Sequence, residues 1–106
     1  MVKVKNMCSP VSGREVANQF VISGDGKQTF QSYDSMIVEV DLENKTITIG
    51  IDYDYSNTTN RYRCAFFRDY TFSELRPLAD RKTLEKALSD GEFGNWKVVK
   101  AWVNEY

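Results

Sequence analysis

The sequence predicts an α+β fold in which a mostly antiparallel β-meander sheet is packed on one face by two short helices, in a single domain over residues 1–106. Three observations support this prediction. The first half alternates apolar and polar residues in short runs separated by turn residues, which is typical of antiparallel strands with one exposed face. After Tyr55, apolar residues recur at the three-and-four spacing of a helix packed on a sheet. A chain of 106 residues without repeats or linkers has room for one hydrophobic core.

The first predicted hairpin pairs residues 15–22 with residues 28–33. Between them, Asp25 and Gly26 tolerate the positive φ angles that a tight hairpin turn requires. The run VKVKN, residues 2–6, can add an edge strand beside this hairpin.

The second predicted hairpin pairs residues 35–42 with residues 45–51 across a turn at Glu43 and Asn44. Its apolar side chains alternate with polar ones. The alternation therefore predicts two apolar faces, formed by Met36, Val38, Val40 and Leu42 in one strand and by Ile47, Ile49 and Ile51 in the other.

The first predicted helix follows Tyr55, and the hydroxyl groups of Ser56, Thr58 and Thr59 can each cap its start. Its apolar stripe faces the sheet and consists of Tyr62, Ala65, Phe66 and Tyr70.

The second predicted helix covers residues 81–90, with Asp80 as N-cap and Gly91 just past its end. Residues 96–104 suit either a helix or a strand. The valine and tryptophan content favours a C-terminal strand.

Composition excludes several classes of function. Lys and Arg number 14 against 15 for Asp and Glu, so a net charge of −1 gives no bulk attraction to nucleic acid or to anionic lipid. No apolar run approaches the roughly 20 residues that cross a bilayer, and a cytosolic location is expected. Cys8 and Cys64 are then expected to be free thiols. Without histidine, the commonest general base and metal ligand are missing, and we expect a protein that is not an enzyme and has no cofactor or metal.

The stretch DYDYSNTTNRY, residues 52–62, has several interpretations. As a calcium loop it fails, because Asn57 replaces the required glycine and Arg63 replaces the bidentate glutamate. As an aspartate phosphotransfer motif it lacks the doubly wound sheet that such chemistry uses, for which too few residues follow Asp52. The favoured interpretation is structural: Asp54 and Ser56 supply acceptors and negative charge at the start of a helix.

Parts of the chain resemble a family of small proteins encoded by phages, plasmids and conjugative elements of Gram-positive and gut bacteria. The stretches that carry this resemblance are VKNM.SP (4–10), NQFVI (18–22), FQSYDS (30–35) and DYDYSNTT (52–59). The resemblance does not extend past residue 70, and Asp52 stands where some relatives carry an aromatic residue. It implies association with mobile elements but transfers no activity.

Charge is unevenly distributed along the chain. Residues 34–56 contain six acidic residues and one basic residue, whereas residues 57–76 contain four arginines and two acidic residues. We therefore predict a polarised docking surface for a host or competitor protein, with a nucleic-acid-processing complex such as a defence nuclease as the suggested partner. Its candidate residues are Glu39, Asp41, Glu43, Asp52, Tyr53, Asp54, Tyr55, Arg61 and Arg68. The alternative is a single-stranded nucleic-acid-binding module, in which aromatic rings stack on bases and arginines contact phosphates.

Overall fold

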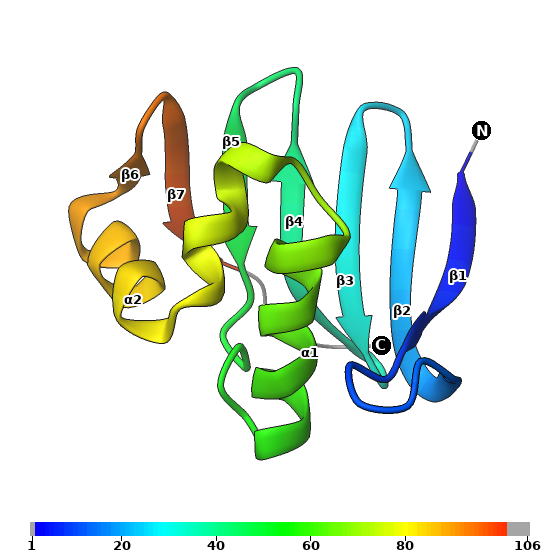
Figure 1. Ribbon diagram of the computed structural model, residues 1–106. Coiled ribbons are helices and arrows are strands. Elements are labelled where there is room, and N and C mark those ends of the chain that lie inside the picture. The colour runs from blue at the N-terminus through cyan, green and yellow to red at the C-terminus, as the bar shows by residue number, and fades with distance from the viewer. Residues whose placement is uncertain (1, 102–106) are drawn as a thin grey trace.

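The computed structural model describes residues 2–101, which form one sheet with three helices on one of its faces (Figure 1). The strands lie side by side in the order β1-β2-β3-β4-β5-β7-β6, and every neighbouring pair is antiparallel except β5 and β7. Their bounds are Lys3–Cys8 (β1), Glu15–Gly24 (β2), Lys27–Ser32 (β3), Ser35–Asp41 (β4), Thr46–Ile49 (β5), Glu92–Phe93 (β6) and Trp96–Lys100 (β7). The predicted α+β class, meander and edge strand are therefore confirmed.

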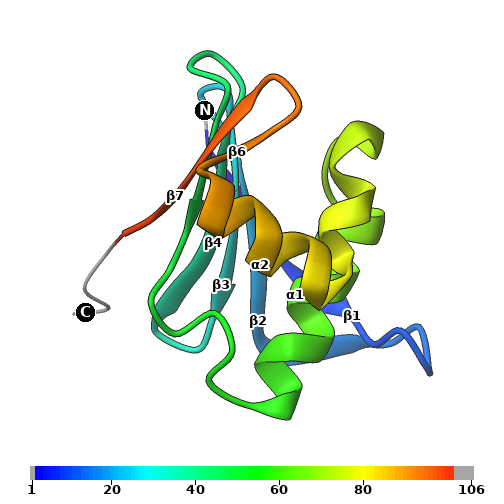
Figure 2. The same ribbon diagram turned by 90° about the vertical axis from the view of Figure 1, so that its left-hand side faces the viewer.

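All three helices cover the same face, and the other face of the sheet is left open (Figure 2). They are α1 (Asn57–Asp69), the 3-10 helix η1 (Ser73–Ala79) and α2 (Arg81–Asp90). The sequence predicted two helices and missed η1, because a short 3-10 segment that contains Pro77 shows no helical periodicity. None of the helices in the described part of the chain is long and apolar enough to cross a membrane.

Local turn and cap signals led to correct predictions. Asp25 and Gly26 have φ angles of 55° and 76°, as a tight hairpin turn demands. Asp80 caps α2 by accepting a hydrogen bond from the backbone nitrogen of Thr83, and Gly91 ends the helix with a φ of 76°. The C-terminal segment is a strand as far as Lys100, and residues 102–104 of the prediction lie outside the described residues.

The predicted alternation in the second hairpin was partly wrong. Ile37 is an extra residue in β4, a β-bulge at which the register with β3 shifts. Ile37 and Val38 are consequently both buried, while Met36 falls on the open face. Leu42 and Ile51 lie beyond the ends of their strands and are exposed, because the chain turns away from the sheet there.

The core lies between the sheet and the helices. The ring of Phe30 on β3 stacks on Phe66 of α1 with centroids 6.0 Å apart, and Phe72 stacks on Trp96 of β7 at 6.2 Å. The predicted α1 stripe is confirmed, since Tyr62, Ala65 and Phe66 are buried and Tyr70 packs against them. This packing fixes α1 over β3 and β4, so that its N-terminus lies near the turn between those strands (Figure 1).

Candidate functional site

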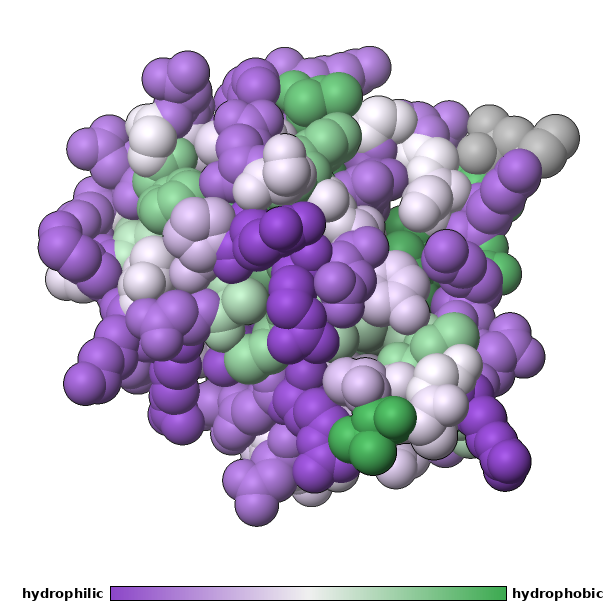
Figure 3. Space-filling view, in the orientation of Figure 1, coloured by the Kyte–Doolittle hydropathy of each residue, from purple (hydrophilic) through white to green (hydrophobic). Residues whose placement is uncertain are grey.

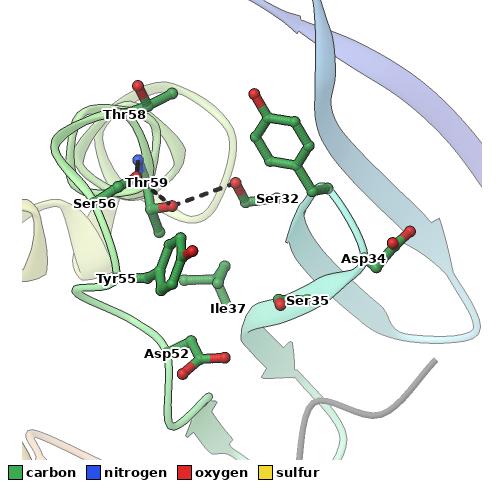
Figure 4. Close-up of a pocket in the computed structure, with 10 residues that line it drawn as sticks. Ser32, Asp34, Ser35, Ile37, Asp52, Tyr55, Ser56, Thr58 and Thr59 are labelled. Atoms are coloured by element: carbon green, nitrogen blue, oxygen red, sulfur yellow. Dashed lines mark hydrogen bonds between the residues drawn. The ribbon is translucent and has the colours of Figure 1, made fainter.

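A pocket of about 540 Å³ lies where the β3–β4 turn meets the β5–α1 junction, residues 50–56 (Figure 4). The turn and its flanking strands contribute five lining residues: Ser32, Tyr33, Asp34, Ser35 and Ile37. The junction and the first turn of α1 contribute the other five: Asp52, Tyr55, Ser56, Thr58 and Thr59. Two segments some twenty residues apart in the sequence therefore form one concave surface.

Three hydroxyl groups form the inner wall of the pocket. Ser56, the N-cap of α1, accepts a hydrogen bond from the Thr59 backbone nitrogen and donates one to Thr59 Oγ1, both at 3.1 Å. Thr59 Oγ1 also lies 3.4 Å from Ser32 Oγ on β3 (Figure 4). Ser32 and Thr59 are only 4% and 3% exposed. The hydroxyl chain thus connects the helix start to the sheet and fixes this wall.

Two tyrosines line the pocket without belonging to the core. Tyr33 is 58% exposed and Tyr55 is 79% exposed. In Figure 4 the ring of Tyr55 stands between Asp52 and Thr59, with Ile37 behind it. Tyr33 has a φ of 55°, a left-handed conformation that a bulky side chain rarely adopts.

The charge of the pocket lining is negative. Asp52 lies beside Tyr55, and Asp34 lies at the outer edge of the β3–β4 turn (Figure 4). Among its described residues the lining contains no lysine or arginine. The charged side chains of the lining therefore attract a cationic group, and they do so against the positive end of the α1 dipole at Ser56.

The β5–α1 junction divides its four predicted site residues between two sides. Asp52 and Tyr55 line the pocket. Tyr53 is buried on the other side, where it packs against Arg63, and burial, followed by the nearby charge of Asp54, raises its pKa. Tyr53 is therefore part of the hydrophobic core.

Asp54 was predicted to help cap α1, and the structure gives that role to Ser56 alone. Asp54 instead forms a 3.0 Å salt bridge with Arg81 at the start of α2. At the protein surface, this pair links the β5–α1 junction to the start of α2.

The acidic residues Glu39, Asp41 and Glu43 lie away from the pocket. Glu39 projects from the open face of the sheet and pairs with Lys27 at 3.6 Å. Asp41 accepts hydrogen bonds from the side chain and backbone of Asn44, which lower its pKa. Glu43 lies in the β4–β5 turn against the β2–β3 turn. These carboxylates already have roles in turns or ion pairs.

The predicted arginines lie on α1, which covers the opposite face of the sheet from Glu39 and Asp41. Arg61 and Arg68 are both exposed, and Arg68 pairs with its neighbour Asp69. The structure therefore separates the predicted polarised surface into an open face and a helical face. The tyrosines of α1 do not add to either, because Tyr62 is buried and Tyr70 accepts a hydrogen bond from the Cys8 backbone nitrogen.

Sequence reasoning missed two groups of residues. Tyr33 and Asp34 were not among the candidate site residues, although an aromatic residue in a two-residue turn is itself a signal, since glycine or asparagine fits there with less strain. Arg63 entered the sequence analysis only as an obstacle to a calcium loop and as one of four arginines in residues 57–76, yet it is 1% exposed. Nothing in a local pattern distinguishes it from Arg61.

Both cysteines are free, and Cys64 donates a hydrogen bond to the Ala79 carbonyl oxygen of η1 at 3.0 Å. Over residues 2–101, no three carboxylate or cysteine side chains are grouped so as to hold a metal ion.

An open sheet with helices on one face and a pocket at a strand–helix junction define a small α+β domain with a surface pocket in the size range of ligand sites. The chain belongs to a family of unknown function, DUF8033, whose model matches residues 2–85. No curated protein sequence and no solved structure matches the chain.

Proposed function

We propose that this chain is a non-catalytic accessory protein of a mobile genetic element that binds a basic host or rival protein and inhibits it. The observation that carries the proposal is the pocket, where Tyr33, Tyr55, Asp34 and Asp52 line one concavity without any cationic side chain. Exposed tyrosines are among the residues that contribute most to protein interfaces. Carboxylates around them attract a basic surface and orient it.

The chemistry of the surface suits a polar partner. On the helical side, hydrophilic residues cover most of the surface and hydrophobic residues appear in small separate groups (Figure 3). A broad apolar patch typical of permanent assemblies is not visible on this side. Charge and aromatic contacts are therefore the interactions on which a partner of this face would depend.

A nuclease or another nucleic-acid-processing complex is the partner that this charge pattern fits. Such proteins line their channels with lysine and arginine to contact phosphates. A protein that presents carboxylates beside aromatic rings can occupy the same channel and exclude the nucleic acid. Inhibition would then result from competition and would require no catalytic residue.

The association with mobile elements rests on the resemblance described above. Two of the stretches that carry it, residues 30–35 and 52–59, come together in the structure and supply nine of the ten residues that line the pocket. The pocket is thus built mainly from the segments by which the chain resembles its relatives.

Single-stranded nucleic acid is the alternative partner, and exposed Arg61 and Arg68 are its main support. This alternative also needs aromatic rings that stack on bases. On the open face β2 presents Phe20, which is half-buried, and the exposed rings of Tyr33 and Tyr55 lie in the pocket, whose described lining has two carboxylates and no arginine to contact phosphates. The geometry therefore favours a protein partner.

Site-specific crosslinking in the native host tests the proposal. A photoreactive amino acid at position 55 should capture a partner whose crosslinked peptide is rich in lysine and arginine. The same group at Arg61 serves as control. Purified wild type should inhibit the captured protein, whereas Asp34→Asn with Asp52→Asn should inhibit at least about tenfold less, because steering and contact charges are lost.

A matched pair, Glu39→Gln with Glu43→Gln, removes the same number of charges outside the pocket and should leave inhibition unchanged. If Glu39→Gln with Glu43→Gln weakened inhibition more than Asp34→Asn with Asp52→Asn, the docking site would lie on the open face. Capture of an acidic protein, or of single-stranded DNA or RNA, would contradict the proposal.

A further inference from the structure

We infer that the pocket accepts an arginine side chain of the partner, with its guanidinium placed against Tyr55 and Tyr33 and its N–H groups directed at the hydroxyl and carboxylate oxygens. The inference rests on the proposed function and specifies which partner residue the pocket recognises. Three observations support it: the balance of hydrogen-bond donors and acceptors, the two exposed rings and the strained turn.

The polar atoms of the pocket are mostly acceptors. Ser56 uses its only hydroxyl proton on Thr59, and the contact between Thr59 and Ser32 uses one more. These hydroxyls are left with more lone pairs than protons, and Asp34 and Asp52 add only acceptors.

A buried acceptor, the side chain of Gln19, lies on the strand next to Ser32 but does not line the pocket. Gln19 is paired with Ser32 across β2 and β3 and is 2% exposed, and its Oε1 has no hydrogen-bond partner among the described residues. A ligand that is rich in donors complements the hydroxyl and carboxylate acceptors that do line the pocket, whereas a phosphate or carboxylate does not.

The aromatic rings select among donors. A cation over a tyrosine ring is attracted by the negative face of the π-system, and arginine uses this contact more often than lysine. The planar guanidinium also stacks on the ring while its edge donates up to five hydrogen bonds. A lysine ammonium has three donors and no planar surface, so it fits the pocket less well.

Tyr33 has the positive φ of a hairpin turn, where a bulky side chain is an uncommon choice, and we infer from that choice that its ring has a role outside folding. Its φ of 55° costs about 1–2 kcal/mol for an ordinary residue, and asparagine or glycine would reduce that cost. Because the side chain is mostly exposed, core packing does not offset the strain. Strained exposed residues of this kind gather at ligand sites.

Titration of the full-length protein with fluorescent hexapeptides tests the inference. Fluorescence anisotropy at low salt gives the affinity, and ¹⁵N NMR shifts locate the site. Hexa-arginine should bind about fivefold or more tightly than hexalysine, and hexaglutamate should not bind. The NMR shifts should concentrate in residues 32–37 and 52–59.

Variants separate the contribution of the rings from that of the charges. Tyr55→Phe keeps the ring and should keep the preference for arginine, whereas Tyr55→Leu and Tyr33→Asn should reduce it to about twofold or less. Asp34→Asn with Asp52→Asn should weaken both basic peptides about tenfold. Wild-type-like NMR spectra away from the pocket would show that each variant remains folded.

The outcomes distinguish failure of the arginine pocket from failure of the proposed function on which it rests. Equal affinity for hexa-arginine and hexalysine, with both lost in the double Asn variant, would overturn the arginine pocket and leave the basic-partner proposal standing. Basic peptides that bind as well to the double Asn variant as to wild type, or that shift residues of the open face, would overturn both.

Discussion

Arg63 and Tyr53 form the contact that fixes the β5–α1 junction: Arg63 Nη1 donates a hydrogen bond to the Tyr53 carbonyl oxygen at 2.6 Å. The same nitrogen donates to Asn60 Oδ1 at 2.7 Å, and the guanidinium lies 5.4 Å from the Tyr53 ring centroid. Burial lowers the pKa of Arg63. Because this contact holds the backbone between Asp52 and Tyr55, a buried arginine determines how one side of the pocket is presented.

Replacement of Arg63 by Met should lower the free energy of unfolding by about 1–3 kcal/mol, because the buried Tyr53 carbonyl loses its donor. Urea denaturation measures the change. Arg61→Met removes an exposed arginine from the same helix and should stay within about 0.5 kcal/mol of wild type. A stabilised Arg63→Met protein would mean that desolvation of the guanidinium outweighs its hydrogen bonds.

Ser56 and Asp54 should differ sharply in their effect on stability. Ser56→Ala removes the N-cap of α1 and should cost about 1 kcal/mol. Asp54→Ala breaks an exposed salt bridge with Arg81 and should cost less than about 0.5 kcal/mol. Thermal or chemical denaturation compares the two, and a double-mutant cycle on Asp54 and Arg81 isolates the pair. If Asp54→Ala lowered the free energy of unfolding as much as Ser56→Ala, Asp54 would also contribute to capping α1.

Tyr33→Asn should leave the protein as stable as wild type or stabilise it by up to about 1 kcal/mol, because asparagine adopts positive φ with less strain. Its effect should appear in peptide binding and not in folding. Tyr55→Asn changes a similarly exposed tyrosine whose φ is not positive, so no such gain is expected. A loss above about 1 kcal/mol in Tyr33→Asn would show that the ring stabilises the fold.

Asn44→Ala should raise the pKa of Asp41 part of the way toward the ordinary value for aspartate, because it removes the side-chain hydrogen bond that is the largest cause of the lowering and keeps the backbone one. A carboxyl whose pKa is lowered on folding adds stability above its unfolded pKa and loses it as the pH falls through the folded value. As Asp41 becomes protonated at acidic pH, the Asn44→Ala variant should therefore lose less stability from this carboxyl group than the wild-type protein does. Carboxyl ¹³C NMR titration measures the pKa directly, and Asn57→Ala, on α1, should leave it unchanged.

Local sequence determined the elements and their ends. Asp25 and Gly26 form the predicted turn, Asp80 and Gly91 bound α2, and the change of period after Tyr55 marks α1. Each of these features depends on backbone conformations and hydrogen bonds within a few residues. A single sequence carries that information directly.

The candidate site was only partly predictable for the same reason. Asp52 and Tyr55 were recognised because they follow a strand and precede a helix. Their neighbours Tyr33 and Asp34 come from another hairpin and meet them only when α1 packs over β3 and β4. Glu39 and Asp41 are close to this stretch in sequence, yet the alternation of side chains along β4 directs them to the opposite face.

The tertiary structure alone decided the long-range relationships. β7 is inserted between β5 and β6 and runs parallel to β5, an arrangement that no local pattern specifies. Arg63 is buried and Arg61 is exposed, although they lie only two positions apart on one helix, because η1 and the junction cover one side of α1. Propensity and periodicity act over one or two turns of chain, whereas burial and pocket shape depend on which distant surfaces pack together.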